Sequence, residues 1–274
     1  MNELAPAKIN LALHVRERMP DGYHRLETIF AFARDGDGLS VAPAGELSLR
    51  ITGPFAEGLS TGADNLVLRA AEMLRTAAGV KQGAALTLDK RLPVASGIGG
   101  CSADAAAALR LLARFWNTGV DLHPLAAALG ADVPACLVGR PVRGEGRGDQ
   151  LAEVPAEGLS GLPLLLINAG VAMPTGPVFA AWDQVDRGPL ATGDPLGAAL
   201  SGRNDLEAPA ISIVPPIGDL VAWLQQQPGV LLARMSGSGA TCFALFRSDA
   251  DRDAADEAAN RAWPGAWRLS TALA

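Results

Sequence analysis

The chain is poor in cysteine and histidine, with three residues of each among 274. Cys101, Cys136 and Cys242 are scattered and show no Cys-x-x-Cys spacing. This pattern predicts neither a disulfide framework nor a structural zinc site. We expect free thiols in a reducing compartment, and therefore a cytoplasmic protein.

Long apolar segments are also missing. The longest apolar run, residues 162–167, is interrupted by Asn168 and Gly170, far short of the roughly 20 residues that a membrane span needs. The N-terminal residues carry Glu3 before any cation and lack the apolar core of a signal peptide. We therefore expect no membrane partner.

Basic charge is limited as well. The 23 lysines and arginines are outnumbered by 29 acidic residues, which leaves a net charge of −6 and no basic run. A nucleic-acid partner is therefore not expected. Apolar residues make up 49% of the chain, as in a soluble globular protein of one large or two ordinary domains.

Lysine and tyrosine are rarer still. The chain has one tyrosine, Tyr23, and its lysines are Lys8, Lys81 and Lys90. The whole sequence is biased toward arginine, alanine and glycine. Residue types that this bias disfavours, such as lysine and tyrosine, should remain at positions where no other residue can do the same task. Lys8 and Tyr23 are therefore candidate functional residues.

The most informative segment present is residues 92–109, LPVASGIGGCSADAAAAL. A glycine-rich loop that enters a helix presents backbone N–H groups and the positive end of the helix dipole to an anion, most often phosphate. Gly-Lys occurs nowhere in the chain, which excludes the Walker loop, and Ser102 stands where the dinucleotide fingerprint needs glycine. We expect Ser102 to cap the helix and Asp104 to lie in its first turn. From this segment alone, a plain strand-to-helix connection remains the alternative.

Near the N-terminus the sequence alternates like a strand. The apolar residues at positions 7, 9, 11, 13 and 15 predict one buried face, so Lys8 and Asn10 project together from the other, about 7 Å apart. Asp21-Gly22 predicts a hairpin turn, and residues 23–32 a returning strand.

The remaining pattern predicts an α+β protein of two domains, because strands cluster early and helices alternate with strands afterwards. Asp64 or Asn65 caps a predicted helix. The other expected strands are residues 47–51, 85–89, 163–168, 231–234 and 241–246, and the expected helices are 66–79, 121–130, 178–185, 219–227 and 248–261. A Pro- and Gly-rich stretch at 140–162, with a strand or two inside it, marks the expected domain boundary.

Other residues could carry chemistry. Asp132, in Gly-Ala-Asp-Val-Pro, either caps a helix or faces a cleft as a base toward a substrate hydroxyl, with Lys8 neutralising charge. Lys8 would otherwise be a solvated strand residue. Tyr23 and His24 could stack on and hydrogen-bond a flat heterocycle, with Phe179 as its second face or as a core residue. A second glycine loop, residues 236–241, is either a tight strand connection or a second clamp on a polyanion.

Six segments occur in an order that resembles a known superfamily. They are APAKINLAL, DGYHRLETIF, LPVASGIGGCSADAAAAL, LGADVPACL, RNDLE and MSGSGATCFALF, and they span about residues 5–246. Together they resemble the GHMP small-molecule kinases, most closely the branch that phosphorylates a cytidine diphosphate-linked methylerythritol in the non-mevalonate isoprenoid pathway. Alternatives are another GHMP enzyme, such as a homoserine or mevalonate kinase, or a non-catalytic nucleotide- or RNA-binding protein on the same scaffold. The Tyr23-His24 pair argues against the first, and Lys8 with Asp132 against the second.

The resemblance implies an α+β fold with a domain like ribosomal protein S5 domain 2 at residues 1–152, a C-terminal GHMP kinase domain at 153–274 and a site between them. It implies ATP, Mg²⁺ and a small-molecule substrate phosphorylated on its 2-hydroxyl, in a monomer or homodimer. Lys8 and Asp132 match the catalytic pair, and Gly237 to Ala240 the third family motif. The residues that match the ATP phosphate loop are Pro93, Val94, Ala95, Ser96, Gly97, Ile98, Gly99, Gly100, Cys101, Ser102 and Ala103. Those that match the substrate pocket are Asn10, Tyr23, His24, Thr175 and Phe179, with Thr175 near the substrate diphosphate.

The loop departs from the family at two positions, and its metal ligands are not determined by the sequence. Ser96 and Cys101 stand where the family often has glycine, and a positive φ there would cost roughly 1 kcal/mol or more. We expect the backbone at both positions to suit a non-glycine residue. No metal-ligand set is legible, although Ser102 and Asp104 are candidates.

Overall fold

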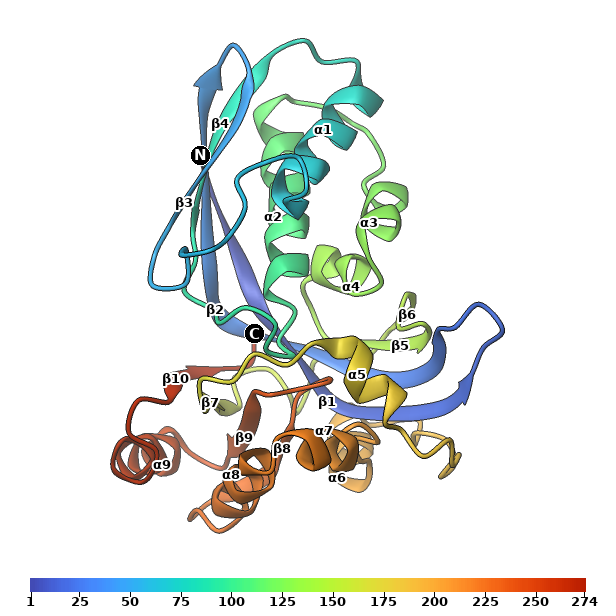
Figure 1. The fold of residues 1–274 in the computed structure, drawn as a ribbon, viewed down its shortest axis with the longest axis vertical. Coiled ribbons are helices and arrows are strands. Elements are labelled where there is room, and N and C mark those ends of the chain that lie inside the picture. Colours follow the sequence, from blue (N-terminus) through green and yellow to red (C-terminus); the bar gives the residue numbers. More distant parts are fainter. The chain divides into compact units, whose positions relative to one another are not determined.

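The computed structural model describes all 274 residues and contains two compact units, each built from separate stretches of chain. The first unit comprises residues 1–7, 35–94 and 99–139, and the second comprises 8–34, 95–98 and 140–274. Strands β1 (Asn2–Arg18) and β2 (His24–Ala44) contribute to both units (Figure 1). The mixture of helices and sheets confirms the α+β class, and the division at residue 152 stays a prediction.

In the first unit, the second half of β2 pairs antiparallel with β4 (Gly83–Asp89), and β4 pairs parallel with β3 (Leu47–Thr52). Figure 1 shows the helices of this unit on one side of β3 and β4. They are α1 (Leu66–Ala78), α2 (Gly100–Phe115), α3 (His123–Leu129) and α4 (Val133–Val138). The buried alanines of α2 have little side chain, which lets α1 and α4 pack closely against it.

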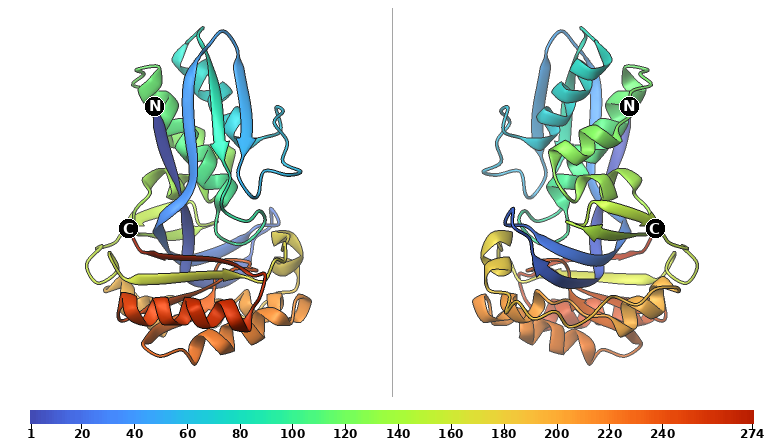
Figure 2. Two further views of the ribbon diagram at one scale, coloured as in Figure 1. Left: turned by 90° about the vertical axis from the view of Figure 1, so that its left-hand side faces the viewer. Right: turned by 90° about the vertical axis from the view of Figure 1, so that its right-hand side faces the viewer.

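In the second unit, the first half of β2 pairs antiparallel with β5 (Val142–Gly146), which pairs with β6 (Gln150–Glu153). A separate antiparallel sheet has the order β10 (Trp267–Ala272), β7 (Pro163–Asn168), β9 (Cys242–Phe246) and β8 (Val230–Met235). Helices α8 (Pro216–Gln225) and α9 (Asp249–Ala262) pack on one face of this sheet, as Figure 2 shows. The remaining helices are α5 (Thr175–Ala180), α6 (Pro195–Ser201) and α7 (Glu207–Ile213).

Local sequence signals located several helix ends correctly. Asn65 caps α1 by accepting a hydrogen bond from the Val67 N–H, and Gly79 ends that helix in the left-handed region at φ 64°. Ser248 caps α9 in the same way through the Asp251 N–H. These signals act within a few residues, so they can be recognised without knowledge of the tertiary structure.

Two predicted helices begin or end elsewhere. Helix α2 starts after Gly99, whose φ is 65°, so the prediction that Ser102 caps it is wrong. The helix predicted at 178–185 covers Thr175–Ala180 instead. It stops early because the Asp183 carboxylate accepts the Val185 N–H, a local turn that competes with helical hydrogen bonding. Helices α6 and α7 and strand β10 were not predicted.

A buried ion cluster holds the first unit together where the glycine loop begins. The Lys90 Nζ lies 2.5 Å from Asp37 Oδ2 and 2.7 Å from Asp104 Oδ2, and the three side chains are at most 4% exposed. The other Asp37 oxygen accepts the N–H groups of Arg91 and Leu92. The cluster therefore fixes the chain that enters the loop to the helix that leaves it.

One ammonium group faces two carboxylates in this cluster, and Asp104 Oδ1 is buried without a hydrogen-bond partner. Burial raises the pKa of Asp104 to about 7, with Lys90 opposing the shift and Asp37 adding to it. Because an unfolded aspartate has a pKa of about 3.9, the folded protein retains a proton between about pH 4 and pH 7 that the unfolded chain loses. The stabilisation from this group is therefore greatest at low pH and decreases as the pH rises through that window.

Replacing Asp104 with asparagine removes this titration. We expect the free energy of unfolding of the wild type, minus that of Asp104→Asn, to fall as the pH is raised from 5 to 8. Urea unfolding of both proteins at several pH values measures the difference. A difference that stays constant or increases across this range would contradict the assigned titration.

Candidate functional site

Lys8 and Asn10 lie side by side on β1 in the second unit. The Lys8 Nζ donates to Asn10 Oδ1 at 2.8 Å, and Asn10 Nδ2 donates to Thr28 Oγ1 at 2.8 Å. Both residues are 3% exposed, and the ammonium group lies 5.2 Å from the centre of the Phe30 ring. Lys8 is therefore not a solvated strand residue: the structure holds its cation in a fixed, buried position, on the face shared with Asn10.

The glycine loop that follows β4 has an unusual backbone. Ala95, Gly97 and Gly99 adopt positive φ values of 50°, 78° and 65°. Ser96 and Cys101 do not, which confirms that these two positions suit non-glycine residues. The strained position is Ala95, at a cost of about 1–2 kcal/mol.

Residues 95–98 of this loop belong to the second unit, and their carbonyl groups are all hydrogen-bonded there. The carbonyl oxygens of Ala95, Ser96 and Ile98 accept the N–H groups of Met173, Thr241 and Lys8, at 2.8–3.0 Å. The Gly97 carbonyl accepts from the Ser236 hydroxyl at 3.0 Å. Because C=O and N–H point in opposite directions across a trans peptide, the amide groups that follow these carbonyls face away from the bonded side. This arrangement can bind an anion through backbone N–H groups.

The second glycine loop packs directly against the first. A Cβ on Gly97 would lie 2.4 Å from the Ser236 carbonyl oxygen, and one on Gly237 would lie 3.0 Å from Asn10 Oδ1. The Ser236 hydroxyl also accepts the Asn10 N–H at 3.2 Å. The structure therefore joins three segments predicted as functional: the Lys8 strand, residues 95–98 and the second glycine loop at 236–241.

In the first unit, the loop continues into α2. Gly99 makes no side-chain cap, and the first N–H groups of this 16-residue helix have no partner within it. Cys101, in the first turn, retains exposed surface, while removal from water raises the pKa of its thiol.

Asp132 also belongs to the first unit, at the start of α4. Its side chain forms no capping hydrogen bond with the helix. Asp132 therefore occupies the predicted N-cap position without a side-chain cap, and its role as a base stays a prediction.

Aromatic side chains gather around His24 in the second unit. The His24 ring centre lies 4.9 Å from that of Phe179 and 5.7 Å from that of Trp182, which meets it edge-on. Burial, followed by the charge of Arg18, lowers the pKa of His24. The imidazole is therefore neutral at neutral pH and can both donate and accept a hydrogen bond. Tyr23, the preceding residue, is 53% exposed, with the Arg147 guanidinium 4.9 Å from its ring centre.

Thr175 begins α5, the helix that carries Phe179. Its hydroxyl lies 3.1 Å from the Ser238 hydroxyl, so α5 is linked to the second glycine loop. Trp182, which meets the His24 ring, and Arg147, which lies over the Tyr23 ring, were not among the predicted residues. Trp182 is 4% exposed and belongs to the hydrophobic core of the second unit, as a tryptophan three residues after Phe179 usually does.

No helix of the structure combines the length and apolar character needed to cross a membrane. No group of three or more His, Cys, Asp or Glu residues is arranged to hold a metal ion. Asp104, a candidate ligand, has one oxygen bonded to Lys90 and the other buried.

Comparison with known proteins assigns the family. Residues 65–140 match the family model of the GHMP kinases N terminal domain, and residues 192–265 match that of the GHMP kinases C terminal. The 4-diphosphocytidyl-2-C-methyl-D-erythritol kinase of Rhizorhabdus wittichii is 61% identical, covering 99% of this chain and 94% of its own. The enzyme of the same name from Novosphingobium aromaticivorans is 49% identical, covering 100% and 93%.

Solved structures agree with this assignment. A crystal structure of 4-(cytidine 5'-diphospho)-2C-methyl-D-erythritol kinase is 36% identical, with a TM-score of 0.82 over 99% of both chains. A homoserine kinase from Cytophaga hutchinsonii, at 18% identity and a TM-score of 0.75 over 100% and 94% of the two chains, shares the fold. The chain is a kinase that belongs to the GHMP kinases and, within them, to the 4-diphosphocytidyl-2-C-methyl-D-erythritol kinase family.

Proposed function

We propose that this kinase transfers the γ-phosphoryl group of ATP to the 2-hydroxyl of 4-diphosphocytidyl-2-C-methyl-D-erythritol, with Lys8 and Asp132 as its catalytic pair. The observation that carries the proposal is the joining of Lys8, Asn10, the loop at 95–98 and the second glycine loop in one hydrogen-bonded assembly. The His24, Phe179 and Trp182 cluster supports a substrate with a flat base.

The first glycine loop supports binding of a nucleoside triphosphate. Backbone N–H groups at 96–99 and at the start of α2 supply donors without a side chain in the way. No dedicated metal cage accompanies them, because the chain has no cluster of metal-ligating side chains. A magnesium ion, when bound, supplies charge neutralisation to the phosphates, and no step here depends on a protein ligand to it.

Phosphoryl transfer is dominated by positioning and by neutralisation of charge on the transferred group. In the proposed mechanism, Lys8 provides a fixed positive charge, and Asn10 holds its Nζ in place. Asp132 accepts the proton of the attacking hydroxyl. A carboxylate is a sufficient base when that proton leaves late, as a loose transition state allows.

The pocket around His24 would bind the cytosine. Tyr23 and Phe179 flank the base, and the neutral imidazole hydrogen-bonds its polar edge. Thr175 lies beside Ser238 of the third motif and binds near the substrate diphosphate.

The direct test of the substrate is a coupled ADP-release assay. We expect ATP-dependent turnover with 4-diphosphocytidyl-2-C-methyl-D-erythritol and little with homoserine or mevalonate, because neither of these has a base for the pocket. Faster turnover of homoserine or mevalonate would contradict the proposed substrate, and the absence of ADP release with all three would contradict the activity.

Removing either member of the catalytic pair should reduce kcat. We expect Lys8→Ala and Asp132→Ala each to lower kcat about 100-fold or more, with little change in KM for ATP. Lys81→Ala is the control, since Lys81 is an exposed lysine. Steady-state kinetics decide the matter: a large rise in KM with kcat intact would mean that these residues only bind.

Removing the tyrosine ring should weaken binding of the cytidine substrate. A stacked base contributes about 1–3 kcal/mol, so we expect Tyr23→Ala to raise KM for that substrate about 5- to 150-fold. Tyr23→Phe keeps the ring and should stay close to the wild type. Equal KM values for Tyr23→Ala and the wild type would exclude stacking.

A further inference from the structure

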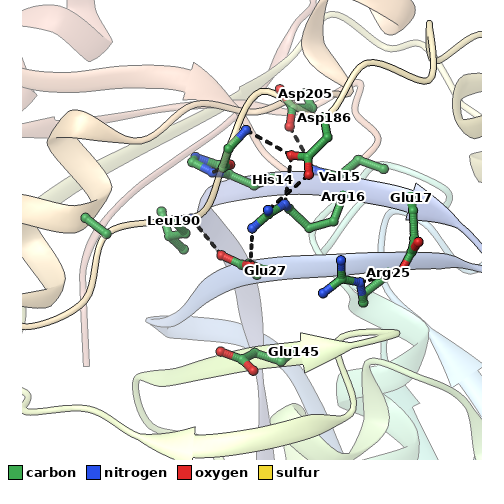
Figure 3. A network of polar contacts seen from close by, with 12 residues as sticks. His14, Val15, Arg16, Glu17, Arg25, Glu27, Glu145, Asp186, Leu190 and Asp205 are labelled. Atoms are coloured by element: carbon green, nitrogen blue, oxygen red, sulfur yellow. Dashed lines mark hydrogen bonds and ion pairs between the residues drawn. The ribbon is translucent and has the colours of Figure 1, made fainter.

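After Trp182 the chain runs without helix or strand over residues 183–191, a segment called the strap below. Figure 3 shows it beside strands β1 and β2, joined to them by polar side chains. The established chemistry of phosphoryl transfer uses none of these contacts. They nevertheless fix the segment that follows directly from the aromatic cluster around His24.

Glu27, on β2, is the centre of this network. Its carboxylate is 12% exposed and accepts from Arg16 Nη1 at 2.5 Å, Arg143 Nη2 at 3.1 Å and the Leu190 N–H at 2.6 Å. This largely buried carboxylate thus accepts hydrogen bonds from β1, β5 and the strap. Hydrogen bonds to an ionised, desolvated carboxylate are about twice as strong as neutral ones.

The two arginines that Glu27 orients also hold the strap themselves. Arg16 forms a two-pronged ion pair with Asp186, through Nε at 2.8 Å and Nη2 at 3.0 Å. Arg143 donates to the carbonyl oxygens of Leu190 and Ala191 at 3.1 and 2.9 Å. Without Glu27, these guanidinium groups, both 14% exposed, would lose their shared anion and the geometry it imposes.

A second attachment point lies at Gly188. Its carbonyl accepts from Arg203 Nη2 at 2.9 Å and lies 3.2 Å from His14 Nδ1. The His14 Nε2 accepts the Arg203 N–H, so Nδ1 carries the ring proton and donates to Gly188. The middle of the strap is therefore held independently of Glu27, and loss of Glu27 should loosen the strap without detaching it.

The strap connects this network to the aromatic cluster. It begins directly after Trp182, and Phe179 precedes it in α5. His24 lies three residues before Glu27 on β2. Trp182 lies in the hydrophobic core and Phe179 packs against it, and fastening the strap to β2 adds a restraint on the chain that directly follows these two rings.

We propose that Glu27 is a positioning residue for the base pocket, which keeps Phe179 and Trp182 against His24 by fastening residues 183–191 to β1, β2 and β5. The inference rests on the proposed function, because it takes the cytosine to bind at this cluster. Glu27 acts through the strap and is not a catalytic residue.

The test compares Glu27→Gln with Glu145→Gln. Both glutamates bond Arg143, but Glu145 is 54% exposed and lies on β5, away from the Leu190 N–H. We expect Glu27→Gln to raise KM for the cytidylylated substrate about tenfold or more, with kcat and KM for ATP within about twofold of wild type. Glu145→Gln should match the wild type, and Glu27→Asp should recover part of the lost affinity.

Hydrogen–deuterium exchange supplies a readout that does not depend on the substrate. The backbone N–H groups of residues 183–188, 190 and 191 should exchange faster in Glu27→Gln than in the wild type or Glu145→Gln. Unchanged exchange, or faster exchange with unchanged KM, overturns the positioning role, as does an equal loss of affinity for ATP. If the wild type fails to turn over the cytidylylated substrate, the proposed function is wrong. Hydrogen–deuterium exchange then still tests the role of Glu27 in fastening the strap, which unchanged exchange in Glu27→Gln would overturn.

Discussion

The close backbone approach of Gly97 to Ser236 and Gly237 is the contact on which the candidate site depends. Any Cβ at Gly97 would overlap the Ser236 carbonyl, so only glycine lets the two loops meet. That approach places the Ser236 hydroxyl between the Asn10 N–H and the Gly97 carbonyl. One side chain thereby sets the register between the strand of Lys8 and the loop proposed to bind phosphate. In this arrangement the carbonyl groups of residues 95–98 bond to the second unit, so the N–H groups on the opposite side of these peptides are available to an anion.

This arrangement shows how the loop proposed to bind phosphate could do without a lysine of its own. In a Walker loop, the cation is part of the loop that binds the phosphates. Here the cation is on β1, and its position relative to residues 95–98 is fixed by the Lys8 N–H bond to Ile98 and by the Asn10–Ser236–Gly97 chain. Separating the cation from the loop makes both depend on tertiary contacts, so neither segment alone specifies the site.

The sequence could predict what depends on near neighbours. The alternation along β1 put Lys8 and Asn10 on one face, and Asn65 and Gly79 marked the ends of α1. The α+β class followed from the order of the expected strands and helices, and the family from the order of the motifs. The sequence could not predict contacts between distant residues: Glu27 and Leu190 are 163 positions apart, and no local pattern predicts that they meet. The helix after Pro174 was misplaced for a different reason. Its apolar spacing continues past Ala180, but the turn formed by the Asp183 side chain and the Val185 N–H ends the helix.

The shortage of lysine has a physical explanation that the structure makes visible. Of the three lysines, Lys8 and Lys90 are buried and Lys81 is exposed. Lys90 places a compact ammonium group between two carboxylates, 3.0 Å from where a Cβ on Gly100 would stand. A planar guanidinium needs more room and a different donor geometry, so arginine could not replace lysine there without displacing α2. Lys8 meets a similar limit, with Asn10 at 2.8 Å and the Phe30 ring nearby. In a chain biased toward arginine, two of the three remaining lysines, Lys8 and Lys90, thus stand at buried sites that suit a small, fixed point charge. Rarity alone therefore does not separate Lys90, which joins two carboxylates in the first unit, from Lys8, whose catalytic role is a proposal.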